Sequence, residues 1–220
     1  MIAAALLLAL LMQDVPAEQG IVVNGAVGCG PPFARVYIAP MGAPFRTDGT
    51  TDPMALWFAE ADPDHDGRLT PAEFSADADR FFVTLDSNHD GEIDPQEIIV
   101  YEGQVAPEIR LYQQGAQDRR PRTGRERKAA RQAARSRVDY DMAYGAGKFA
   151  SLNIPEPVAS ADLDINRGVS RAEFAQVAAN RFAMLDAAAR GYLTADMLPR
   201  SPAQSAIDAC RAAALKKGHR

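Results

Sequence analysis

Two stretches of the sequence carry large apolar residues at the spacing of one helical face. In residues 71–86 these are Phe74, Ala78, Phe81, Phe82 and Leu85. The spacing recurs in residues 171–186, at Phe174, Val177, Ala178, Phe182 and Leu185. Because positions three and four apart share one face of a helix, each stretch predicts an amphipathic helix with one buried side. Pro71 suits the first turn of the first of these helices.

The two stretches belong to a repeat with a period of 100 residues. This offset aligns Asp62 with Asp162, Asp64 with Asp164, Glu73 with Glu173, Phe74 with Phe174, Phe82 with Phe182, Asp86 with Asp186 and Gly91 with Gly191. Within each copy, a shorter repeat of 24 residues relates 62 to 86 and 162 to 186. The chain therefore contains two copies of one unit, which we place at residues 52–102 and 149–200.

Each predicted helix is flanked by twelve-residue segments that begin with Asp. A hard divalent cation takes six to eight oxygens, and a twelve-residue loop supplies them from positions 1, 3, 5, 7, 9 and 12, with glycine at position 6. The first segment, "DPDHDGRLTPAE" at residues 62–73, has Gly67 at position 6 and the apolar Leu69 at position 8. Its oxygens are predicted to come from the side chains of Asp62, Asp64, Asp66, Thr70 and Glu73 and from the backbone carbonyl of Arg68.

The second segment, "DSNHDGEIDPQE" at residues 86–97, repeats the pattern around Gly91 and Ile93. Its predicted ligands are the side chains of Asp86, Asn88, Asp90, Asp94 and Glu97 and the backbone carbonyl of Glu92. His65 and His89 stand at position 4 of their loops, which points away from the ion, so we interpret them as surface residues. A match at all of these positions, twice at one spacing, predicts two working cation sites.

The two loops of the second unit depart from the pattern. Loop 3, residues 162–173, keeps side-chain ligands at Asp162, Asp164, Asn166, Ser170 and Glu173, but Arg167 stands at position 6. A residue other than glycine there must adopt a left-handed backbone conformation, so we expect weak binding or none. Loop 4, residues 186–197, keeps only Asp186 and is predicted not to bind, although Gly191 and Leu193 preserve its shape.

These loops resemble the EF-hand family, and the resemblance covers both units. It implies calcium as the bound ion at the first two loops. The short spacing and the Asp62-Pro63 pair also resemble lanmodulin, a periplasmic EF-hand family selective for lanthanide ions, although Ser87 and Leu163 break the proline pattern. A lanthanide ion is therefore the alternative to calcium. A structural or buffering role is expected over a switching role, because the large residues of the predicted helices are Phe and Leu, with Met184 as the exception.

The spacing of the loops also predicts the fold. Only twelve residues separate Glu73 from Asp86, so one helix is expected to serve both loops, and the fold class is predicted as all-α. If the two shared helices pack antiparallel, loop 1 meets loop 4 and loop 2 meets loop 3. Short β bridges would then join Leu69 to Leu193 and Ile93 to Val169. Asp52 and Pro53 predict the start of the helix before loop 1, whereas residues 154–161 leave room for little more than one turn before loop 3.

The remaining segments carry fewer signals. An apolar run from Ile2 to Met12 is too short to span a bilayer and predicts a signal peptide at residues 1–17, hence a periplasmic or secreted protein, with a buried N-terminal helix as the alternative. Residues 18–51 are predicted to be irregular, and residues 201–220 to form a basic helix or tail. Whether Cys29 and Cys210 form a disulfide stays open.

Residues 103–148 are interpreted as an Arg-rich insertion between the units. Residues 110–137 carry ten Lys or Arg against two acids, in a chain of net charge −5. A loop followed by a solvated helix is favoured, and a patch for a protein or an anionic polymer is the alternative. The sequence shows no Ser/His/Asp signature, Cys-x-x-Cys pair or glycine-rich phosphate loop, so no enzyme is predicted. A monomer without a membrane span is expected.

Overall fold

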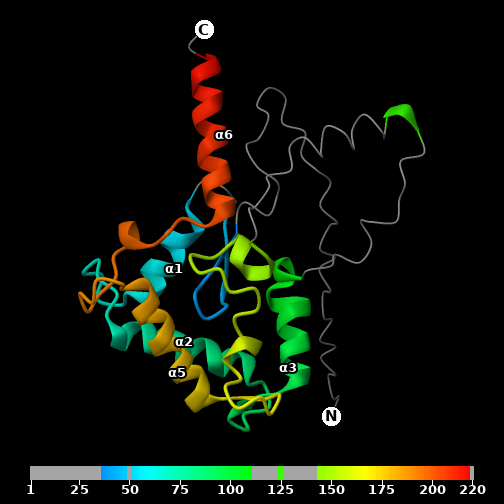
Figure 1. The fold of residues 1–220 in the computed structure, drawn as a ribbon, viewed down its shortest axis with the longest axis vertical. Helices are drawn as coiled ribbons and strands as arrows, with labels where there is room; N and C mark the ends of the chain where they lie inside the picture. The colour runs from blue at the N-terminus through cyan, green and yellow to red at the C-terminus, as the bar shows by residue number, and fades with distance from the viewer. Residues whose placement is uncertain (1–35, 49–50, 111–122, 126–142, 219–220) are drawn as a thin grey trace, which may run out of the picture.

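The structure is a computed structural model that describes residues 36–48, 51–110, 123–125 and 143–218. Within these residues the fold is mostly helical and contains two small antiparallel sheets of two strands each (Figure 1). The prediction of an all-α fold is therefore only approximate. The predicted signal peptide, Cys29 and most of the basic segment lie outside the described residues.

The first unit begins with helix α1 (Pro53–Ala61), where Asp52 caps the N-terminus by accepting a hydrogen bond from the Met54 backbone N–H at 3.0 Å. Loop 1 leads into helix α2 (Pro71–Leu85), whose last residue directly precedes Asp86 of loop 2. Thr70 caps α2 in a reciprocal arrangement with Glu73. One helix thus serves both loops, as predicted.

Helix α5 (Arg171–Leu185) takes the same place in the second unit and packs against α2. The rings of Phe74 and Phe182 lie 5.6 Å apart, and so do those of Phe82 and Phe174. The start of each helix thus contacts the later part of the other, so the two helices are antiparallel. All four rings are buried and form the centre of the core.

The loops pair across the two units. Strand β3 (Glu92–Ile93) of loop 2 pairs antiparallel with β4 (Val169–Ser170) of loop 3, with Ile93 opposite Val169. An isolated antiparallel bridge joins Leu69 of loop 1 to Leu193 of loop 4. The predicted pairing of loop 1 with loop 4 and of loop 2 with loop 3 is therefore confirmed.

The segment predicted to be irregular, residues 18–51, contains a hairpin, and this part of the prediction is wrong. Strands β1 (Val36–Ile38) and β2 (Pro44–Arg46) pair antiparallel, and Tyr37 and Ile38 are fully buried. The Tyr37 ring lies 5.6 Å from that of Trp57 on α1. Three-residue strands give too short an alternation to be recognised in sequence, but the hairpin covers α1 and completes the core.

Shorter elements complete the described chain. They are α3 (Pro95–Val100), the π-helix η2 (Tyr101–Val105), and the 3-10 helices η3 (Pro107–Ile109), η4 (Gly145–Lys148), η5 (Ala159–Ala161) and η6 (Ala195–Met197). The single turn of η5 before loop 3 agrees with the limited room predicted there. The edges of the predicted insertion, in η3 and η4, contact one another and contribute buried residues.

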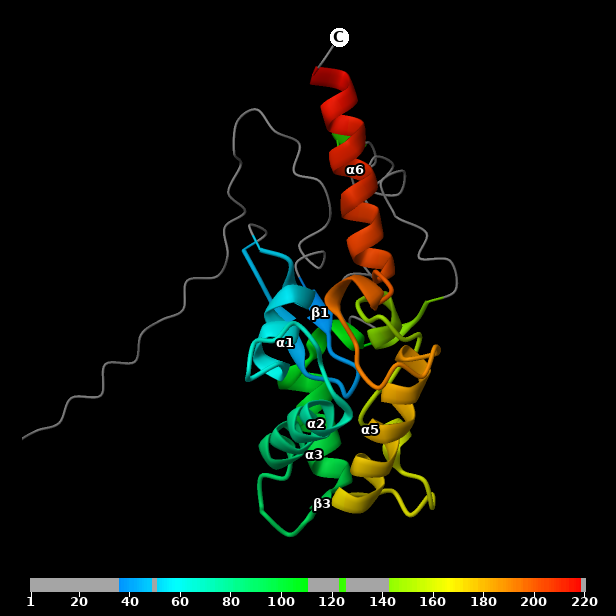
Figure 2. The ribbon, with the colours of Figure 1, turned by 90° about the vertical axis from the view of Figure 1, so that its left-hand side faces the viewer.

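The C-terminal segment, residues 201–220, was predicted to be a basic helix or a tail, and it contains helix α6 (Pro202–Gly218). It extends away from the other helices, and loops 2 and 3 lie at the opposite end of the molecule (Figures 1 and 2). Among the described residues, no helix has both the length and the apolarity that a membrane crossing requires.

Candidate metal centres

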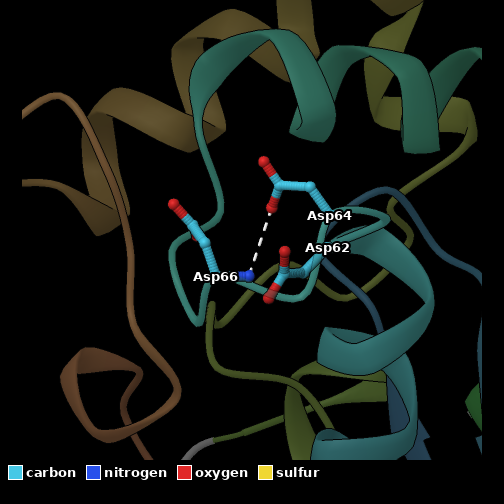
Figure 3. A group of neighbouring side chains, drawn as sticks. All are labelled: Asp62, Asp64 and Asp66. Atoms are coloured by element: carbon cyan, nitrogen blue, oxygen red, sulfur yellow. Dashed lines mark hydrogen bonds between the residues drawn. The ribbon is translucent and has the colours of Figure 1, made fainter.

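Loop 1 brings three carboxylates together. Asp62, Asp64 and Asp66 each present an oxygen within 4.8 Å of the others (Figure 3). Asp66 donates its backbone N–H to Asp64 Oδ1 at 3.2 Å, and Gly67 donates its own to Asp62 Oδ2 at 3.0 Å. Asp62 Oδ1 is buried and has no hydrogen-bond partner. A buried carboxylate oxygen without a partner is costly, and a hard cation coordinated by these oxygens would remove that cost.

Repulsion among the carboxylates of loop 1 also favours a bound cation. The pKa of the Asp64 carboxyl lies above its usual value. The hydrogen bond from the Asp66 backbone lowers it, but desolvation and the negative charges of Asp66 and Glu73 raise it by more. The loop therefore holds more negative charge than its own donors neutralise, which is the condition that a bound cation relieves.

The remaining predicted ligands of loop 1 lie at the start of α2. Glu73 Oε2 accepts hydrogen bonds from the Thr70 backbone N–H and hydroxyl, both at 2.8 Å. Thr70 is thus both the position 9 residue and the N-cap of α2. The Arg68 guanidinium lies 4.7 Å from the centre of the Tyr192 ring in loop 4, which adds a cation–π contact between the paired loops.

In loop 2 the first aspartate and the last glutamate accept hydrogen bonds on both of their oxygens, unlike Asp62 in loop 1. Asp86 accepts hydrogen bonds from the Gly91 N–H at 3.0 Å and the Asp90 N–H at 3.1 Å. Glu97 is buried: its Oε1 accepts from the Ser87 hydroxyl and N–H and from the Asn88 N–H, and its Oε2 accepts from Asp94. Asp94 in turn caps α3. The Asp86, Asp90 and Glu97 carboxylates do not form a group of three as close as that in loop 1.

The Asn88 side chain also contacts Asp90, with Nδ2 donating to Asp90 Oδ2 at 2.9 Å. Glu92 is exposed and lies in β3, opposite Ser170. The contact between Ser87 and Glu97 was not predicted, because position 2 of such a loop is not a ligand position. The sequence feature that could have predicted this contact is a hydroxyl residue at position 2 in a loop that ends in glutamate.

Loop 3 keeps the geometry of a site. Asp162, Asp164 and Glu173 present oxygens within 4.8 Å of one another. Hydrogen bonds from the Ser170 hydroxyl and N–H, and from the Leu163 and Asp164 N–H groups, lower the pKa of Glu173. Asn166 donates its backbone N–H to both Asp162 Oδ1 and Asp164 Oδ1, at 3.1 Å each. The predicted weakness of this loop as a cation site stays a prediction.

One hydrogen bond is common to all four loops. The N–H at position 6 donates to Oδ2 of the first aspartate, at 3.0 Å for Gly67, 3.0 Å for Gly91, 2.9 Å for Arg167 and 2.7 Å for Gly191. Arg167 makes this bond with a φ of 82°, the left-handed conformation predicted for it. Loop 4 thus keeps the shape of the others, while Ala188, Arg190 and Met197 occupy its ligand positions 3, 5 and 12.

These features define a helix–loop–helix unit that can bind a hard divalent cation. Residues 54–76 and 78–99 match the family model of the EF hand, and these two matches support an EF-hand calcium-binding family for this part of the chain. The matched segments contain all of loop 1 and all of loop 2. No curated protein and no solved structure matches the chain.

Proposed function

We propose that the protein binds calcium at loops 1 and 2, and that the bound ions stabilise the fold or buffer calcium. The observation that carries the proposal is Asp62 Oδ1, a buried oxygen without a hydrogen-bond partner beside the carboxylates of Asp64 and Asp66. The six predicted ligand residues of each loop suit calcium, which prefers carboxylate and carbonyl ligands. The ligand sets are those predicted from the sequence for residues 62–73 and 86–97.

The burial of the apolar residues at the loop pairs and between α2 and α5 favours a stabilising role over a switching role. Leu69, Ile93, Val169 and Leu193 are fully buried at the loop pairs, and the phenylalanines of α2 and α5 face one another in the core. A sensor needs an apolar surface that calcium can expose. Here the large residues that would form such a surface already pack together.

Three further parts of the proposal rest on sequence. The apolar run from Ile2 to Met12 supports export to the periplasm or beyond the cell. The alternative ion is a lanthanide, supported by the short loop spacing and by Pro63. A calcium-dependent contact of the Arg-rich segment with an anionic partner is supported by the charge of residues 110–137.

Calorimetric titration with calcium and then with lanthanum tests the proposal. We expect two calcium ions per chain, and one fewer for either Asp62→Asn or Asp86→Asn, because each amide keeps the hydrogen bond to the glycine but loses a charged ligand. Asp186→Asn in loop 4 is the matched control and should still bind two ions. Binding of lanthanum without calcium would favour the lanthanide alternative, and binding of neither ion would refute both.

A further inference from the structure

Loop 3 differs from loops 1 and 2 on its outward side. Positions 1, 3 and 5 carry candidate ligands, and positions 2, 4 and 6 each follow one of them. In loop 3 these intervening positions hold Leu163, Ile165 and Arg167, all exposed. Loop 1 has Pro63, His65 and Gly67 there, and loop 2 has Ser87, His89 and Gly91. Only loop 3 of these three therefore presents large apolar side chains beside a cationic one.

The backbone conformation and the solvent exposure at position 165 are both unfavourable for an isoleucine. Ile165 has a φ of 62°, a left-handed conformation that is unusual for a β-branched residue. It is also 84% exposed, the highest value among the exposed large apolar residues in the described chain, and Leu163 is 51% exposed. Histidine occupies the same conformation in loops 1 and 2, with φ of 58° and 60°. Neither folding nor packing within the described chain accounts for an isoleucine here.

Arg167 adds a free positive charge to the same tip. Its backbone N–H is bound to Asp162, but its guanidinium makes no ion pair or hydrogen bond with any described residue. Loop 3, whose outward face is defined as Leu163, Ile165 and Arg167, lies at the end of the molecule opposite α6 (Figures 1 and 2). This outward face therefore lies where a flat surface can contact it.

We propose that the outward face of loop 3 contacts the surface of an anionic membrane. The two apolar side chains would enter the boundary between headgroups and acyl chains, and the guanidinium would bind lipid phosphate. A lipid surface is favoured because a deformable layer accommodates two projecting side chains without a shaped pocket, and because phosphate complements the unpaired Arg167. The groove between α2 and α5, whose lining includes Phe82 and the Asp79–Arg171 ion pair, does not include these residues.

Calcium should strengthen this contact, and this part rests on the proposed function. Loops 2 and 3 are joined through β3 and β4, so the carboxylates of both loops lie at the end that would face the lipid. Their negative charge repels anionic headgroups, and a bound cation reduces the repulsion. The expected result is vesicle binding that increases with calcium and decreases at high ionic strength.

Cosedimentation with vesicles of phosphatidylcholine, with and without phosphatidylglycerol, tests the contact. The double variant Leu163→Ser with Ile165→His carries the residues of loop 2 at these positions and leaves every candidate ligand in place. We expect it to bind anionic vesicles more than about tenfold more weakly than the wild type, because two apolar side chains no longer enter the bilayer. Met184→Ser on α5, where the methionine is 60% exposed, is the matched control and should bind as the wild type does.

Equal binding of the wild type and the double variant would overturn the proposal, as would equal binding to neutral and anionic vesicles. Calorimetry with calcium on the same proteins separates the two proposals. Calcium binding without vesicle binding would refute the membrane contact and leave the calcium sites standing. Vesicle binding that depends on Leu163 and Ile165, in a protein that binds no calcium, would refute the calcium sites and leave the membrane contact standing.

Discussion

Leu69 and Leu193 exchange two backbone hydrogen bonds, from the Leu69 N–H to the Leu193 carbonyl at 2.8 Å and from the Leu193 N–H to the Leu69 carbonyl at 2.9 Å. Both side chains are fully buried. Loop 4, which lacks most of the ligand oxygens, thus holds the residue at position 8 of loop 1 in place. This contact explains why loop 4 keeps Gly191 and Leu193 although its ligand positions have changed.

Leu193→Ala should therefore destabilise the fold and weaken calcium binding at loop 1. Loss of a buried leucine costs about 2 to 5 kcal/mol, part of which comes from the cavity left behind. Urea unfolding measures the first effect and calorimetry the second. The matched variant Val169→Ala, at the other loop pair, should weaken loop 2 more than loop 1. An equal loss at both loops in each variant would show that the pairs do not act locally.

Removal of calcium should lower stability without exposing an apolar surface in the folded protein. A ligand at a hundredfold excess over its dissociation constant adds about 2.7 kcal/mol to the free energy of unfolding per site. Thermal unfolding with calcium and with a chelator measures this difference. Fluorescence of an apolar dye should be the same in both folded forms, since the α2 and α5 phenylalanines stay packed. A clear increase with calcium would instead indicate a switch.

The helical core and the loop pairing could be predicted because each rests on local patterns. The apolar spacing of residues 71–86 and 171–186 predicted α2 and α5, and the twelve residues between Glu73 and Asp86 left room for only one helix. From that constraint the pairing of Ile93 with Val169 followed geometrically.

The contacts made by Arg181 could not be predicted in the same way. This buried side chain donates hydrogen bonds to the carbonyls of Pro40 and Pro157, both at 2.8 Å, and to the Ser160 hydroxyl at 2.9 Å. The three partners lie in segments without regular pattern, so only the tertiary fold brings them together. The one signal was the repeat itself, which aligns Arg181 with the apolar Phe81. Likewise, the hairpin of β1 and β2 is too short to show a period.

Arg167→Gly should increase both stability and cation binding at loop 3. Glycine adopts the φ of 82° found at this position without the steric cost of a side chain, which is roughly 1 kcal/mol or more. The change also removes a positive charge close to Asp162 and Asp164. Calorimetry should then show a third calcium ion per chain.

Gly67→Ala makes the opposite change, because it removes the glycine from position 6 of loop 1. Its φ is 78°, and a Cβ there would meet no atom within 4 Å, so the substitution tests backbone strain alone. It should lower stability by about 1 kcal/mol and weaken calcium binding at loop 1. If Arg167→Gly leaves both the stoichiometry and the unfolding midpoint unchanged, position 6 does not limit loop 3.

The buried carboxylate of Glu156 should make stability depend on pH near neutrality. Both of its side-chain oxygens are buried, and neither accepts a hydrogen bond of full geometric quality, although the Ala159 and Val158 N–H groups lie near them. Burial and the negative charge of Glu102 raise its pKa from 4.5 to about 7, although the Val158 and Ala159 backbone N–H groups and the Arg181 guanidinium lower it in part. The folded chain therefore keeps a proton on Glu156 that the unfolded chain has already lost.

As pH rises from about 5 to about 8, the unfolding free energy should fall by an amount that Glu156→Gln removes. A pKa displaced from 4.5 to about 7 corresponds to about 3 kcal/mol, so the variant should exceed the wild type by up to that amount at about pH 8 and match it near pH 4. Urea unfolding across this range, with Glu108→Gln as the control, measures the difference. Parallel pH profiles for wild type and Glu156→Gln would show that Glu156 is ionised in the folded protein throughout this range.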